Sequence, residues 1–174
     1  MMKSVILMKL SLVLLCLCSC SVFSGSKDKG DADKPAIPYE KESIILNINS
    51  DPQLNLYQGQ PHSLALCIYQ LKDPNAFNQL SEERNGLPRL MQCERFDPSV
   101  LSSKRIFVHP ARHVKEVRDR AEGARYLGIV AGYYTLEKSR VVRFYPIPRP
   151  GFFGGSKELV INLDLGQRQI QDVK

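Results

Sequence analysis

Apolar and polar side chains alternate strictly in two segments of this chain, and this alternation restricts the fold more than any other feature. In residues 44–48 (IILNI), Ile44, Leu46 and Ile48 share one face. In residues 159–165 (LVINLDL), every odd-numbered position is Ile or Leu. Because successive side chains of a β-strand point to opposite faces, each segment predicts a strand with one face against a core.

Other segments give further strand signals. Residues 62–71 form a longer, apolar-rich run, and residues 141–147 form a short one. Residues 125–134 contain two glycines, which allow close approach of another backbone. Val114 and Val117 lie among charged residues and predict a surface strand. Many short strands separated by turn residues predict an all-β fold, a β-sandwich.

One stretch departs from the strand pattern. Asp73 and Pro74 have the residue types of a helix N-cap and a first helical position. Phe77 and Leu80 follow at helical spacing, and Asn, Gly and Pro interrupt the pattern further on. We therefore predict two short helices, at about residues 74–93, as an insertion on the sandwich.

The amino-terminal segment has the pattern of a secretory signal that ends at a cysteine. Lys3 and Lys9 precede an apolar run at residues 10–17, and Cys20 follows a small residue. Cys20 resembles the acylated cysteine of a bacterial lipobox, with residues 1–19 as the signal peptide. The alternative is a membrane-spanning helix, which needs about 20 apolar residues. Lys9 interrupts the run and polar residues follow Cys20, so the sequence favours the lipoprotein signal.

We expect two further parts after the signal. Residues 20–41 comprise the lipidated Cys20 and a stretch rich in Ser, Gly, Asp, Lys and Pro, which predicts a flexible tether. As a coil of some 20 residues, the tether has a root-mean-square span of about 25 Å. Residues 42–174 form the predicted β-sandwich domain with its helical insertion.

Two of the five cysteines remain in the domain. Cys67 and Cys93 are an even pair in a compartment where disulfides form, and a bridge between them is one interpretation. Both lie beside apolar residues, so two buried thiols are the other. The sequence leaves this choice open.

Charge and motifs argue against several function classes. The formal net charge is +6, and removal of Lys3 and Lys9 with the signal leaves +4. Acids are interspersed among the basic residues, which predicts a solvated face and no nucleic-acid partner. His109 and His113 lack the companion ligands of a recognisable zinc site. There is no H-E-x-x-H, G-x-S-x-G or P-loop motif, so we predict no enzyme, no metal and no cofactor beyond a covalent lipid on Cys20.

A Gly-rich segment, Gly151 to Gly155, lacks the lysine and the following helix of a phosphate-binding loop. It predicts a mobile hairpin. Its two phenylalanines, Phe152 and Phe153, suit either a packed turn or a contact tip.

Three sequence blocks resemble the type VI secretion lipoprotein family, known as TssJ, SciN or VasD. The first runs from Leu54-Asn55-Leu56 through Gly59-Gln60-Pro61, and it continues into the second, SLALCIYQLKDPNAFNQL. The third is YLGIVAGY at residues 126–133. The resemblance covers nearly the whole chain. It weakens at residues 85–105 and 146–155, so it lends no support to a Cys67–Cys93 bridge.

This resemblance implies a transthyretin-like β-sandwich with a small helical insertion, held by acyl chains on the periplasmic face of the outer membrane. It also implies binding to the periplasmic C-terminal region of the large inner-membrane component TssM, with other subunits of the membrane complex as further candidate partners. Members contact TssM through the loop between the first two strands, which is residues 50–62 here. The carried-over contact residues are Gln53, Leu54, Asn55, Leu56, Tyr57, Gln58, Gly59 and Gln60.

The residues of this loop fit that role by themselves. A turn-rich segment with exposed Leu54, Leu56 and Tyr57 is the kind of aliphatic and aromatic tip that anchors an interface. The alternative is that the two leucines fold back and cap the edge of the sandwich. A contact role is favoured for Tyr57, and both interpretations stay open for the leucines.

Two other functions compete with docking. One is a free-standing periplasmic ligand-binding or inhibitory lipoprotein, which requires a deep apolar pocket. The other is a periplasmic hydrolase, which requires acids or histidines clustered in a cleft. The sequence displays no such cluster.

Overall fold

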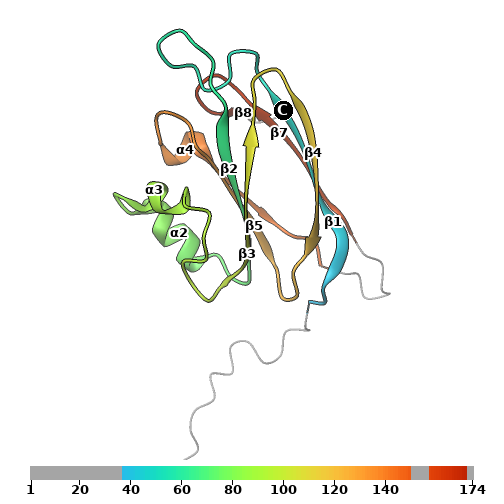
Figure 1. Ribbon diagram of the computed structural model, residues 1–174. Helices are drawn as coiled ribbons and strands as arrows, with labels where there is room; N and C mark the ends of the chain where they lie inside the picture. Colours follow the sequence, from blue (N-terminus) through green and yellow to red (C-terminus); the bar gives the residue numbers. More distant parts are fainter. Residues whose placement is uncertain (1–36, 150–156, 172–174) are drawn as a thin grey trace, which may run out of the picture. The chain divides into compact units, whose positions relative to one another are not determined.

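A computed structural model describes residues 37–149 and 157–171. The predictions for the signal peptide, for Cys20, for the tether up to residue 36 and for the Gly151–Gly155 hairpin lie outside these residues. The described chain forms two four-stranded sheets that face each other (Figure 1). The predicted all-β sandwich with a small helical insertion is confirmed.

The first sheet has the strand order β4-β1-β7-β8. Its strands are β1 (Glu40–Ser50), β4 (His113–Arg120), β7 (Leu159–Leu165) and β8 (Ile170–Gln171). The second sheet has the order β3-β2-β5-β6. Its strands are β2 (Leu64–Leu71), β3 (Val100–Val108), β5 (Tyr126–Ala131) and β6 (Val142–Pro146).

β1 lies inside the first sheet, antiparallel to β4 and parallel to β7. The predicted alternation is correct: Ile44, Leu46 and Ile48 are fully buried between the sheets, and Asn47 and Asn49 point outward. On the outer face, the amides of these two asparagines donate hydrogen bonds to the aligned residues of β7, Asn162 and Asp164, at 3.0 and 2.8 Å. The surface strand predicted around Val114 and Val117 is β4.

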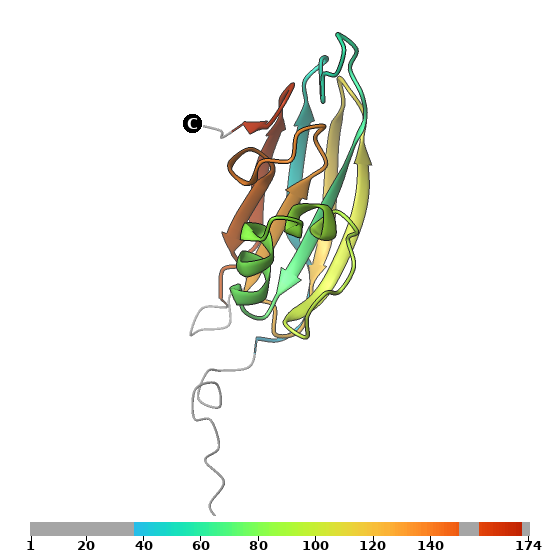
Figure 2. The same cartoon turned by 90° about the vertical axis from the view of Figure 1, so that its left-hand side faces the viewer.

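β2 is buried on both faces, which explains its nearly continuous apolar sequence. On one face, Gln70 reaches across to the first sheet and donates a hydrogen bond to the Asp119 carbonyl at 2.8 Å. The other face lies under helices α2 (Asn75–Glu82) and α3 (Gly86–Leu90), as Figure 2 shows. There the Tyr69 ring contacts the Phe77 ring of α2, and its hydroxyl donates a hydrogen bond to the Leu90 carbonyl.

The two predicted helices are therefore present between β2 and β3. α2 begins one residue later than predicted, because Pro74 is its N-cap and Asn75 its first residue. Asp73 is therefore not the N-cap as predicted, although its carboxylate accepts a hydrogen bond from the Asn75 backbone N–H at 3.1 Å. A third short helix, α4 (Lys138–Val141), precedes β6 and was not predicted.

A disulfide joins Cys67 of β2 to Cys93, just after α3, with 5.2 Å between their Cα atoms. Cys67 is completely buried. The bond therefore attaches the end of the helical insertion to the second sheet. Beside it, the Arg105 guanidinium of β3 donates hydrogen bonds to the Met91 and Gln92 carbonyls at 3.1 and 2.6 Å.

The folded domain begins before the boundary predicted at residue 42. The Ile37 side chain is buried, and its carbonyl accepts a hydrogen bond from the Gly123 N–H at 2.8 Å. Glu40 forms an ion pair at 2.6 Å with Arg120, whose side chain is only 1% exposed. Residues 37–41, which the sequence predicted as the end of the tether, are therefore part of the folded domain.

Candidate functional site

Three segments distant in sequence meet at one end of the sandwich, beyond the last residue of β1 (Figure 1). They are the β1–β2 loop (residues 51–63), the segment after β5 (residues 132–135) and the β7–β8 turn (residues 166–169). We call this place the loop end. Hydrogen bonds join them, for example from the Leu56 N–H to the Gln167 carbonyl at 2.9 Å.

The β1–β2 loop has a well-defined internal structure. At its start, the Asp51 carboxylate accepts a hydrogen bond from the Gln53 N–H at 2.6 Å. At its tip, Tyr57 and Gln60 exchange two backbone hydrogen bonds of 2.9 Å. The two residues between them, Gln58 and Gly59, have φ values of 49° and 76°, which is the pattern of a type I′ turn. The tip is therefore a tight hairpin.

The candidate contact residues separate into two groups. Leu54 is completely buried and Asn55 is 7% exposed, so of the two interpretations left open for Leu54 the structure supports the one in which it folds back onto the sandwich. Leu56 and Tyr57 are half-buried. The rest of the predicted set is exposed: Gln53, Gln58, Gly59 and Gln60.

Asn55 has a positioning role in the interior of the loop end. It adopts a φ of 49°, which asparagine tolerates better than most residues. Its side-chain carbonyl accepts a hydrogen bond from the Tyr134 backbone N–H at 2.9 Å. The loop is thereby attached to the segment after β5.

An aromatic pair lies on the surface of the loop end. The Tyr57 and Tyr134 rings stack with their centroids 3.4 Å apart and their planes inclined by 10°. Tyr134 is 61% exposed, which is unusual for so large an apolar side chain. A side-chain hydrogen bond with Tyr57 raises the pKa of Tyr134 above its ordinary value of 10.0, so the Tyr134 phenol stays neutral at physiological pH.

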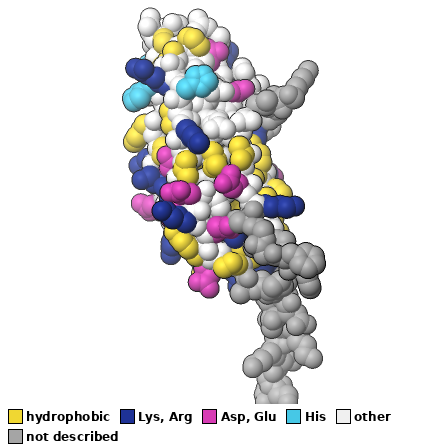
Figure 3. Space-filling view, turned by 90° about the vertical axis from the view of Figure 1, so that its right-hand side faces the viewer, with side chains coloured by type: hydrophobic (Ala, Val, Ile, Leu, Met, Phe, Trp, Pro, Cys, Tyr) yellow, Lys and Arg dark blue, Asp and Glu magenta, His cyan; other side chains and the backbone are white. Residues whose placement is uncertain are grey.

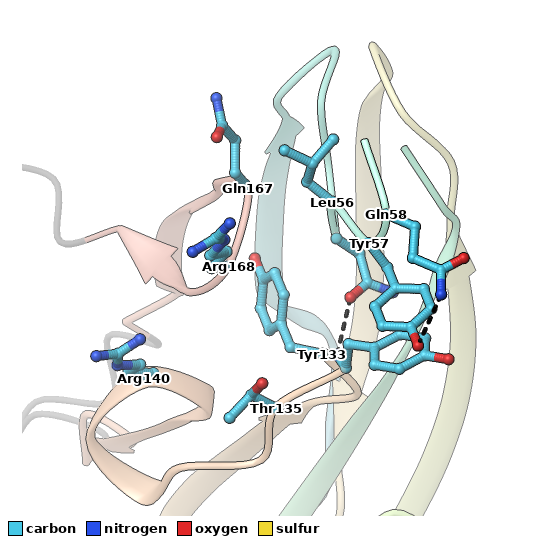
Figure 4. Close-up of a pocket in the computed structure, with 10 residues that line it drawn as sticks. Leu56, Tyr57, Gln58, Tyr133, Thr135, Arg140, Gln167 and Arg168 are labelled. Carbon is cyan, nitrogen blue, oxygen red and sulfur yellow. Dashed lines mark hydrogen bonds between the residues drawn. The ribbon is translucent and has the colours of Figure 1, made fainter. Parts of the chain in front are cut away.

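Beside this pair is an open hollow of about 260 Å³ (Figure 4). Its lining contains two arginines, Arg140 of α4 and Arg168 of the β7–β8 turn, and no acidic residue. The complete lining is Asn55, Leu56, Tyr57, Gln58, Tyr133, Tyr134, Thr135, Arg140, Gln167 and Arg168. The Tyr133 ring is buried, and its hydroxyl donates a hydrogen bond to the Gln169 carbonyl at 2.8 Å. This contact holds the β7–β8 turn against the interior of the domain.

Sequence reasoning found the loop but missed its neighbours. Tyr134, Arg140 and Arg168 join Tyr57 only because β2, β5 and β7 end or begin at the same end of the fold. Strand alternation could not have identified Tyr134 as exposed, because β5 is buried on both faces. The chain leaves the sheet after Ala131, and Tyr133 and Tyr134 then lie in a segment without strand structure, one buried and the other exposed.

Other classes of site lack support within the described residues. No group of three or more His, Cys, Asp or Glu side chains is arranged to hold a metal ion. No helix in residues 37–149 or 157–171 has the length and apolarity to cross a membrane. Figure 3 shows basic and acidic side chains intermixed on the side of the domain that bears β4, as expected for a solvated face.

A family model described as type VI secretion lipoprotein, with the names VasD, EvfM and TssJ, matches residues 42–167. The chain belongs to this family. The match spans both sheets except β8, includes the β1–β2 loop, and ends at Gln167, one residue before Arg168. A comparison with curated protein sequences finds no match.

Solved structures agree with this assignment at the level of the fold. The type VI secretion lipoprotein TssJ1 from Pseudomonas aeruginosa has a TM-score of 0.61 at 22% identity, covering 79% of this chain and 95% of its own. The Lip protein of the type VI secretion system of Serratia marcescens has a TM-score of 0.61 at 23% identity, covering 75% and 96%. A chain from a structure named for the TssM C-terminal domain of EAEC has a TM-score of 0.58 at 16% identity, covering 75% and 97%.

Proposed function

We propose that this lipoprotein docks the periplasmic C-terminal region of a TssM-like inner-membrane component and so supports assembly of the trans-envelope secretion complex. Membership of the type VI secretion lipoprotein family supports the proposal that the complex is a type VI secretion complex. The observation that carries the docking role is the stack of the half-buried Tyr57 on the exposed Tyr134, on a tightly built loop end. No catalytic residue is assigned, because the proposed role is binding.

The loop end suits protein binding for two physical reasons. First, Tyr is enriched at interface hot spots because it combines a large apolar surface with a polar tip. Second, the hydrogen bonds donated by the Leu56 N–H and by the Tyr134 N–H already join the β1–β2 loop to its two neighbouring segments. A preorganised surface loses less conformational entropy on binding than a free loop.

We propose that Cys20 carries the acyl chains and that they hold the protein on the periplasmic face of the outer membrane. Each buried methylene contributes about 0.8 kcal/mol, so several chains anchor a protein firmly. A Cys20→Ser variant should leave the domain folded, release it from the membrane and abolish secretion. Normal secretion by cells in which this variant is soluble would contradict the anchoring role.

The contact itself is tested with Tyr57→Ala. Removal of an interface anchor typically weakens binding by about 2 kcal/mol or more, which is about 30-fold. The matched control is Tyr39→Ala, which removes an exposed tyrosine at the opposite end of β1. Affinity for the TssM-like region is measured by titration calorimetry. Equal affinities for the wild type and both variants would show that the loop end is not the contact.

A free-standing small-molecule-binding lipoprotein is less well supported. Ligand pockets usually have volumes of about 300–1,000 Å³ and mostly apolar walls. The hollow at the loop end is smaller, about 260 Å³, open and bordered by arginine and glutamine side chains. It suits the insertion of a partner's side chain better than the enclosure of a ligand.

A further inference from the structure

The hollow beside the tyrosine stack carries positive charge that its own walls do not neutralise. Arg168 has no ion pair with any residue that the structure describes, and no acid lines the hollow. Arg140 forms one ion pair, between its Nε and the Glu137 carboxylate at 2.8 Å. Both side chains of that pair are about half exposed, at 46% and 52%, so the pair is open to competition from another carboxylate.

The backbone that carries Arg168 is fixed. Gly166 donates a backbone hydrogen bond to the Gln169 carbonyl at 2.9 Å, which closes the β7–β8 turn, and the buried Tyr133 hydroxyl donates to the same carbonyl at 2.8 Å. Figure 4 shows Arg168 and Arg140 on one side of the hollow and Tyr57 on the opposite side. The site thus has a cationic wall and an aromatic wall.

We infer that the docked partner segment is acidic: it places a carboxylate against Arg168 and packs an apolar or aromatic side chain on the Tyr57–Tyr134 stack. This inference rests on the proposed docking function and adds the chemistry of the partner. A guanidinium binds a carboxylate through two parallel N–H donors, so it fixes orientation as well as charge. Arg140 provides a second cation, which binds the partner after its ion pair with Glu137 breaks.

The test uses the full lipoprotein in detergent and the purified periplasmic region of the TssM-like component. Arg168→Glu reverses the charge of an exposed side chain without removing a described contact, and it should weaken binding about tenfold or more at 0.05 M salt. Arg84→Glu is the matched control, because Arg84 is an exposed arginine between α2 and α3, outside the hollow. Its affinity should stay within about twofold of the wild type.

Salt dependence supplies the second measurement. The Debye length is about 10 Å at 0.1 M salt and about 3 Å at 1 M, so the deficit of Arg168→Glu should shrink as salt rises. An Arg168→Glu affinity equal to that of Arg84→Glu at low salt would overturn the inference. A wild-type affinity that does not change between 0.05 and 0.5 M salt would also overturn it.

The design separates this inference from the function on which it rests. If Tyr57→Ala weakens binding and Arg168→Glu does not, the partner docks at the loop end without an acidic contact. If neither variant changes the affinity, docking at the loop end is itself wrong. Circular dichroism melts of all variants, with unchanged midpoints, would establish that the comparison is made between folded proteins.

Discussion

Reduction of the Cys67–Cys93 disulfide should destabilise the domain substantially. The two cysteines are separated by 26 residues in sequence. On the chain-entropy model, a crosslink that closes a loop of that length lowers the conformational entropy of the unfolded chain. This raises the free energy of the unfolded state by about 3.5 kcal/mol at 25 °C. Most small domains have a free energy of unfolding of about 5–15 kcal/mol, so the bond supplies a large share of it.

The assay compares urea unfolding of oxidised and reduced protein. A soluble form that begins after Cys20 contains only these two cysteines. For a slope of about 1.5–2 kcal/mol per molar urea, the reduced protein should unfold at a midpoint about 2 M lower. A Cys67→Ala/Cys93→Ala variant, insensitive to reductant, is the control for effects of the reductant itself.

Two results would refute this reasoning. One is the detection of two free thiols in denatured protein that has not been reduced, because the bridge would then be absent. The other is a midpoint shift below about 0.5 M on complete reduction. In that case the helical insertion would be held by the contacts of Tyr69 with Phe77 and Leu90, with no large contribution from the crosslink.

Two further predictions concern packing and pH. Gly128→Ala should destabilise the domain by about 1–3 kcal/mol in urea unfolding, because its Cβ would lie 2.8 Å from the Phe77 ring; a neutral result would contradict the close packing of α2 on β5. A hydrogen bond from the Tyr39 hydroxyl, reinforced by one from the Glu42 N–H, lowers the pKa of Asp119 below 3.8. Its stabilising effect is therefore complete above that pH and is lost as the pH falls through the lowered value. Asp119→Asn should flatten the acid limb of a stability–pH curve, and an unchanged limb would exclude this role.

The strands that the sequence predicted best are those buried on one face only. β1 and β7 alternate because their outer faces meet water and their inner faces meet the opposite sheet. β3 was missed because it is an edge strand in which Lys104 and Arg105 are exposed in the middle, so it shows no clean period. Charged residues of this kind protect an edge from pairing with other chains. β8 has two residues and is too short for any periodicity.

Only one segment of the candidate site was predicted, because the other segments reach it through long-range strand pairing. The β1–β2 loop was located by resemblance, and its tip by its turn residues. The arginines and Tyr134 come from segments some 80–110 residues further along the chain, and the parallel pairing of β1 with β7 brings the last of these segments to the loop. No local sequence pattern encodes a pairing between strands so far apart.

The position of β1 has a mechanical consequence. This single strand begins at Glu40, which pairs with the buried Arg120, and ends directly before the β1–β2 loop, so it spans the domain from one end to the loop end. Tension applied between those two points would run along the strand axis. It would load the hydrogen bonds to β4 and to β7 in shear, so that many of them must break together. Under the proposed function, the amino-terminal anchor and the docking contact would apply tension along this strand, in the direction that loads these hydrogen bonds together.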